Sequence, residues 1–135
     1  MSYLFSPKGF LQVGGAVLVL VAVLGYIGII GPTADSLFGP LWYFDNAENV
    51  AHLVLGVVAL GLVFTGIGGA DLQKWVTIAV GAFAIFVTLW SLMGPIPEGS
   101  NLWTAQLQNP ADTLLHTLVG VWGLIAGLKK GSSMY

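Results

Sequence analysis

The sequence predicts an all-α integral membrane protein: a four-transmembrane-helix bundle made of two tandem, parallel helical-hairpin repeats, with both termini on the cytoplasmic side. Three observations predict this fold. Of the 135 residues, 56% are hydrophobic and only 7% are charged, whereas about a quarter of the residues in a soluble domain are charged. Four apolar runs are long enough to cross a bilayer, and one histidine-containing segment occurs twice. We expect residues 1–135 to form a single membrane domain.

The four apolar runs are separated by breaks rich in glycine and proline. The first run, residues 10–30, carries no charge, and roughly 20 such residues span a bilayer core. The other runs are residues 51–67, 72–93 and 114–128. Glycine or proline breaks occur at residues 31–32, 66–69 and 94–95. Because lipid offers no partner for backbone polar groups, we expect all four runs to be helical.

The charges predict how the helices lie across the membrane. With four spans, all four lysines fall on one side: Lys8, Lys74, Lys129 and Lys130. All acidic residues except Asp71 fall on the other side: Asp35, Asp45, Glu48, Glu98 and Asp112. By the positive-inside rule both termini are cytoplasmic in a bacterial inner membrane, either cytoplasmic or intracytoplasmic. Loop aromatics are expected in the interfacial belt on the acidic side: Trp42, Tyr43, Phe44 and Trp103.

A segment at the start of the second span recurs at the start of the fourth, in residues 45–56 and 109–120. A cap-competent residue, an acid, a histidine and a glycine recur at identical offsets: Asp45, Glu48, His52 and Gly56, then Asn109, Asp112, His116 and Gly120. The two copies, about residues 10–67 and 73–130, are expected to be related by an axis along the membrane normal. Asp45 and Asn109 are predicted to cap their helices, with Pro110 at the first helical position.

These residues resemble those of a family of small four-helix bacterial membrane proteins of unknown function. The resemblance rests on Val13-Gly14, on Leu24-Gly25-Tyr26 and on the repeated Asp/Asn-x-x-x-Asn/Thr-x-x-His-x-x-x-Gly motif. In that family the second and fourth spans lead into His-Leu-x-x-Gly. The first copy, residues 52–56, matches fully, and the second departs at Thr117. The resemblance covers about residues 9–128 and implies the fold and the repeat, with no defined activity.

The candidate functional residues are His52 and His116, the ionisable residues that lie well inside the predicted spans. A structural interpretation pairs each histidine with residues four and three positions earlier on the same helix face. These partners are Glu48 and Asn49 in the first copy, and Asp112 and Thr113 in the second. Paired in this way, the histidines would help the second and fourth spans pack.

A second interpretation makes His52 and His116 axial ligands of a haem, or of the magnesium of a chlorophyll or bacteriochlorophyll. The acids four residues earlier would then hold the second imidazole nitrogen. Gly56 and Gly120, four residues later, would leave room for a macrocycle or for a close helix. The sequence leaves the cofactor open and predicts no separate metal site.

Small residues predict where helices approach closely. Gly123 and Gly127 form a GxxxG pattern, and Ala47 and Ala51 form a similar pair. Such patterns pack helices within a bundle or between subunits, and the sequence leaves both open. Trp122, in the middle of its span, is expected to contact a partner or a ligand.

We therefore expect a small structural or accessory subunit of a larger bacterial membrane complex, respiratory or photosynthetic. Its partners would be the lipid bilayer and other membrane-protein subunits, and the lack of a basic cluster argues against nucleic acid. The alternatives are tetrapyrrole binding by the two histidines and a small autonomous transporter. We do not expect an enzyme, because no deep acid–base pair, nucleophile elbow or phosphate-binding glycine loop occurs in the sequence.

Overall fold

The computed structural model describes residues 2–31, 36–96, 101–102 and 105–129. Its α-helices are α1 (Pro7–Tyr26), α2 (Asn46–Thr65), α3 (Gly69–Ser91) and α4 (Ala111–Leu128), with a short 3-10 helix, η1 (Gly39–Leu41), before α2. The described residues contain no strand, only one isolated bridge. Each α-helix is long and apolar enough to cross a membrane, which confirms the all-α class and the four predicted spans and indicates a multi-pass membrane protein.

α1 begins before the predicted apolar run of residues 10–30 and ends before that run is complete. Local capping sets both ends of the helix. The Ser6 hydroxyl accepts a hydrogen bond from Gly9 N (3.0 Å), and Pro7 occupies the first helical position. After Tyr26 the chain leaves the helix through Gly28, whose φ of 91° favours glycine. The predicted span of residues 10–30 is therefore displaced toward the N-terminus.

α2 begins with the capping box that the sequence predicts. Asp45 Oδ1 accepts from Glu48 N (2.9 Å), and Glu48 Oε1 accepts from Asp45 N (3.3 Å). The helix ends at Gly66, whose φ of 71° places it in the left-handed region, and a short glycine-rich turn leads into α3. The polar residues from Asn46 onward are thus the first turn of the helix.

α4 begins differently, and the predicted cap at Asn109 is wrong. Pro110 occupies the N-cap position instead of the first helical position, and no side chain caps the helix. The Asn109 amide is directed elsewhere, because its Nδ2 donates to Gly94 O (3.5 Å). The Asp112 carboxylate does reach back, but it accepts from Gln108 N (2.8 Å).

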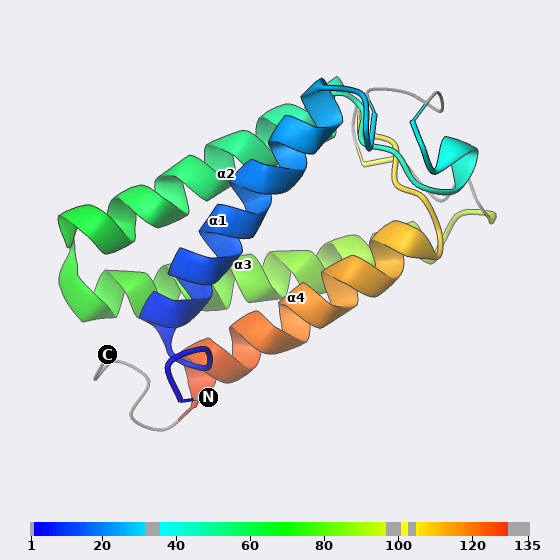
Figure 1. Cartoon of the computed structure of the whole chain (residues 1–135). Helices are drawn as coiled ribbons and strands as arrows, with labels where there is room; N and C mark the ends of the chain where they lie inside the picture. The colour runs from blue at the N-terminus through cyan, green and yellow to red at the C-terminus, as the bar shows by residue number, and fades with distance from the viewer. Residues whose placement is uncertain (1, 32–35, 97–100, 103–104, 130–135) are drawn as a thin grey trace.

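The helices form two hairpins. α1 packs along α2 and α3 packs along α4, and α1 also contacts α3 and α4 (Figure 1). The two long loops, between α1 and α2 and between α3 and α4, lie together at one end of the bundle. The α2–α3 turn, the start of α1 and the end of α4 lie away from that end (Figure 1).

Glycines set the closest approach within each hairpin. A Cβ added at Gly56 of α2 would lie 2.9 Å from Gly15 O of α1. In the second hairpin, a Cβ added at Gly120 of α4 would lie 3.1 Å from Gly81 O of α3. Both positions therefore need a residue without a side chain if the backbones are to stay this close.

The Gly123 and Gly127 pair packs α4 inside the chain. A Cβ at Gly123 would lie 2.9 Å from Gly81 Cα and 3.0 Å from Phe10 Cζ, and one at Gly127 would lie 2.4 Å from Ile78 Cγ1. Of the two arrangements that the GxxxG pattern left open, the structure has the intramolecular one.

Trp122 makes contacts within the chain, and its expected contact with a partner or ligand stays a prediction. Its Nε1 donates to Leu4 O (2.7 Å), and its ring meets Phe10 edge to face at 4.7 Å. Trp122 is half-buried, and the N-terminal segment supplies the acceptor for its indole N–H. Trp122 thereby fastens that segment to α4.

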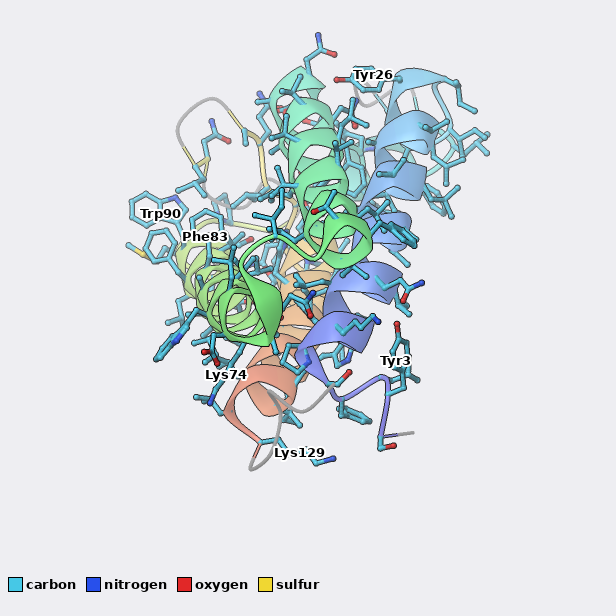
Figure 2. The ribbon with its side chains drawn as sticks, turned by 90° about the vertical axis from the view of Figure 1, so that its left-hand side faces the viewer. Tyr3, Tyr26, Lys74, Phe83, Trp90 and Lys129 are labelled. Carbon is cyan, nitrogen blue, oxygen red and sulfur yellow. The ribbon has the colours of Figure 1, made fainter. Side chains whose placement is uncertain are left out.

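The described lysines lie toward one end of the helices. Figure 2 shows Lys74 and Lys129 toward the same end as Tyr3, with Tyr26 toward the opposite end. Lys8 lies in the first turn of α1. Lys130, Asp35, Glu98 and Trp103, which also entered the charge and belt predictions, lie outside the described residues.

Candidate functional site

The repeated segments of α2 and α4 begin at the end of the bundle where the two long loops meet (Figure 1). Polar side chains from both hairpins are gathered there, and we call them the loop-end cluster: Trp42, Asp45, Glu48, Asn49, His52, Gln106, Gln108, Asp112, Thr113 and His116. All six candidate residues from the sequence, the two histidines and their predicted partners, belong to it.

Hydrogen bonds within the loop-end cluster join one hairpin to the other. Trp42 Nε1, in the first long loop, donates to Asp112 Oδ1 of α4 (3.1 Å). Gln106 N, in the second loop, donates to Asp45 Oδ2 (2.7 Å), and Tyr43 OH donates to Gln106 Oε1 (2.5 Å). The acids that start the two helices therefore also bind the opposite hairpin.

The aromatic residues of the first loop belong to this site, and the belt prediction is wrong for Phe44. Phe44 is 3% exposed, and its ring packs edge to face against Trp42 (5.5 Å) and His52 (4.8 Å). Trp42 is half-buried, and its indole N–H is directed toward the Asp112 carboxylate inside the protein. Phe44 covers the imidazole of His52.

Asp112 is fully buried, and its carboxylate is satisfied by the two loops. Oδ1 accepts from Trp42, and Oδ2 accepts from Gln108 N. In the amide orientation that its neighbours favour, Gln108 Nε2 donates to Asp112 Oδ2 (3.1 Å) and to Tyr43 O (2.8 Å). Charge-assisted hydrogen bonds of this kind offset the desolvation of a buried carboxylate.

His116 binds the backbone of Asp112 instead of its side chain. Its Nδ1 lies 2.7 Å from Asp112 O, and because a carbonyl only accepts, Nδ1 carries the proton. The predicted contact between acid and histidine is not made here, because Trp42 and Gln108 occupy the carboxylate. Thr113, the other predicted partner, donates to Ser91 Oγ of α3 (2.8 Å).

The matching positions of the first hairpin are buried but not hydrogen-bonded in the same way. Glu48 is 4% exposed, and its Oε2 has no partner in the described part of the chain. Asn49 is 0% exposed, and neither amide atom has a partner among those residues. The same holds for His52 Nδ1. Asn49 lies against Gly25 of α1, where an added Cβ would be 1.9 Å from Asn49 Oδ1.

The ionisable groups of the two hairpins are close enough to interact electrostatically. Glu48 interacts with both Asp112 and Asp45, and His52 interacts with His116. The lysines that the structure describes lie at the opposite end of the helices. The loop-end cluster therefore holds three acids without a lysine beside them.

Sequence reasoning missed Trp42, Gln106 and Gln108 as members of this site. A signal was present in the second loop, where two glutamines and an asparagine precede the acid of the repeated motif. The sequence contains no such signal for Trp42, because an aromatic residue in a loop fits an interfacial belt as well as it fits a buried polar site. Among the described residues, no group of three or more histidines and acids is arranged to hold a metal ion.

Comparison of the chain with protein-family models, with curated proteins and with solved structures finds no match. The resemblance to the small four-helix family therefore stays a prediction from the repeated motif. The features of the chain that bear on function are the loop-end cluster and the outward surfaces of the helices.

Proposed function

We propose that this chain is a small structural subunit of a larger complex in a bacterial inner membrane. The observation that carries the proposal is a row of residues on the side of α2 that faces away from Gly56. We call it the α2 outer face: Ala51, Val54, Val58 and Gly61. All four are exposed, and α2 is the least buried of the four spans.

Gly61 is the informative member of the α2 outer face. A Cβ added there would meet nothing within 4 Å, so no contact within the described chain requires a glycine. In a helix interior, glycine is less favourable than alanine by about 1 kcal/mol. In membranes, small residues let the backbone of a neighbouring helix approach closely. The neighbour that this row suits is a helix of another subunit.

The subunit proposal is tested by adding bulk to this face. Gly61→Leu should leave the hairpin intact, since the position is open, but should release the chain from its complex on a native gel of mild-detergent extracts. Ala16→Leu, at an exposed position of α1, is the matched control and should leave the complex unchanged. If Gly61→Leu migrates with the same partners as the parent, the α2 outer face contacts only lipid and the proposal fails.

We also propose that both termini lie on the cytoplasmic side. The support is the charge distribution. The described lysines lie toward the end of the bundle that holds the start of α1 and the end of α4, where Asp71 is the one described acid, and the loop-end cluster holds Asp45, Glu48 and Asp112. Moving positive charge across the membrane during insertion is unfavourable, which is why lysines mark the cytoplasmic side.

We further propose that the two hairpins are tandem copies of one unit. The support is that equivalent contacts recur. A Cβ at Gly56 would lie 2.8 Å from Val19 Cγ2 of the preceding helix, and one at Gly120 would lie 2.5 Å from Ile85 Cδ1 of its preceding helix. Gly56 and Gly120 each follow their histidine by four residues, and Val19 and Ile85 each follow by four residues the glycine, Gly15 or Gly81, that the motif glycine contacts.

Tetrapyrrole binding by His52 and His116 is the second candidate function. The observation that favours it is the bond from His116 Nδ1 to Asp112 O, because ligating histidines are commonly held through the other ring nitrogen in this way. Nε2 of His116 makes no hydrogen bond in the described structure. An absorption spectrum of the gently purified chain decides this function: a Soret or Q band that His116→Gln removes would support it, and a colourless protein would exclude it.

A further inference from the structure

The first hairpin buries polar atoms for which the chain supplies no partner. They are Glu48 Oε2, both amide atoms of Asn49 and His52 Nδ1. Buried polar groups are normally hydrogen-bonded, so four such atoms within the first two turns of one helix are exceptional. Asn49, His52 and Gly56 lie on the same side of α2. Gly56 contacts α1, so this side of α2 faces α1. The unpartnered atoms therefore belong to the buried side of the hairpin.

The equivalent position of the second hairpin does have a hydrogen-bond partner. The lack of partners in the first hairpin therefore comes from the residues that it carries there and not from the helical-hairpin arrangement. In the second hairpin, Thr113 stands at the position of Asn49 and donates to Ser91 of the preceding helix. In the first hairpin the residue opposite Asn49 is Gly25, which has no side chain and leaves the amide without a donor or acceptor. Gly25 also provides the space that the amide occupies.

The charges around Glu48 indicate which kind of ligand its carboxylate would bind. The ionisable groups that face it are Asp45 in its own capping box and Asp112 from α4, and His52 faces His116. Asp112 has three donors from the loops, and both oxygens of Asp45 have backbone donors. Glu48 has one weak donor, Asp45 N at 3.3 Å, and no basic side chain beside it in the described structure.

We propose that Glu48, Asn49 and His52 form a binding site for a small monovalent cation. Glu48 Oε2 and Asn49 Oδ1 are oxygen ligands of the type that hard cations prefer. His52 Nδ1 accepts a hydrogen bond from the cation, if it is ammonium, or from a water that the cation carries. A single carboxylate beside one amide suits one positive charge, and the described residues offer no third acid or histidine placed for a divalent ion.

The site is tested by thermal unfolding of the full chain in detergent, with its five tryptophans as the fluorescence signal. Melting is measured at equal ionic strength in the chlorides of sodium, potassium, ammonium and N-methylglucamine. At saturation, at least one small cation should raise Tm by roughly 5 °C over N-methylglucamine, because a ligand that binds only the folded state stabilises it. An identical Tm in all four salts would overturn the proposal, since water or a proton would then satisfy these atoms.

Two variants assign the effect to these residues. Glu48→Gln removes the charge but keeps a side chain that can complete the capping box, so the helix start is preserved and the salt dependence should be lost. Asn49→Leu removes the amide at similar size, and it too should melt at the same temperature in every salt. Thr113→Val, at the matching position of the second hairpin, is the control and should keep the parent's salt dependence. A salt dependence that survives in both test variants would show that the cation binds elsewhere.

Discussion

At the scale of single residues, equivalent positions of the two hairpins use different chemistry. Thr113 and Ser91 form a hydrogen bond between α4 and α3, whereas Asn49 packs against Gly25 between α2 and α1. The repeated motif predicted that these residues are important, but not which atoms they would meet. That information lies in the opposite helix, and a pattern along one helix does not contain it.

The Gly25 position gives a direct test of this packing. Gly25→Ala would place a Cβ 1.9 Å from Asn49 Oδ1, so one helix must shift, and overpacking of this kind costs about 1–3 kcal/mol. We expect a lower free energy of unfolding in a detergent titration. Gly61→Ala is the matched control, because its Cβ would meet nothing and alanine favours the helix. If the two variants are equally stable, Asn49 does not lie where the structure places it.

Asp112 gives a second test at this scale. Asp112→Asn keeps the shape of the side chain but removes its charge and replaces one acceptor oxygen with an NH2 donor, so the bonds from Trp42 and Gln108 cannot both be kept. Loss of charge-assisted bonds predicts a decrease of about 1.5–3 kcal/mol in the free energy of unfolding. Thr117→Val loses only neutral bonds, the one to Thr113 O and the one with Thr88 Oγ1, and should cost less. An Asp112→Asn protein as stable as the parent would show that the hydrogen bonds to Asp112 do not stabilise the fold.

At the scale of helices and loops, the apolar runs and the glycine and proline breaks between them predicted the four helices. The four spans exist because each run is apolar, and the capping box at the start of α2 follows from Asp45 and Glu48. The N-cap of α4 was mispredicted because the Asn109 side chain donates a hydrogen bond to Gly94 O instead of capping the helix. The first loop was mispredicted because an aromatic residue between membrane spans fits an interfacial belt and a protein contact equally well, as Phe44 illustrates.

The loops hold the hairpins together, and Trp42 tests this role. Trp42→Phe retains the ring but removes the N–H that binds Asp112. Hydrogen exchange of the backbone amides near Asp112 should become faster, while exchange in the middle of α1 and α2 should stay unchanged, because only the link between hairpins is weakened. Trp90→Phe is the control: its N–H binds Asn101 O at an exposed site. Uniformly faster exchange throughout the chain would contradict a role confined to that link.

At the scale of the whole molecule, the charge pattern predicts the topology that we propose. Reporter domains fused to the N-terminus and to the C-terminus should both be active in the cytoplasm, and a reporter inserted in the first long loop should be active outside it. The reason is that the described lysines gather toward one end of the bundle. An external signal from either terminus would refute the proposed orientation.

The role as a subunit is the central claim, and it depends on the α2 outer face. The sequence contains little indication of this surface. Ala51 stood out only as half of a small-residue pair, and Gly61 became informative once the structure showed it open. Exposed apolar residues are expected on any membrane helix, so periodicity alone does not separate a face that meets lipid from one that meets protein.

Photo-crosslinking in the native membrane tests this claim most directly. A photoreactive amino acid replaces Val58, on the α2 outer face, or Leu20, an equally exposed position of α1. We predict that position 58 forms a discrete adduct with another protein, that Gly61→Leu removes this adduct, and that position 20 forms none. If position 58 yields only lipid adducts and the chain keeps its own mass of 14.2 kDa, this face has no protein partner and the central claim is contradicted.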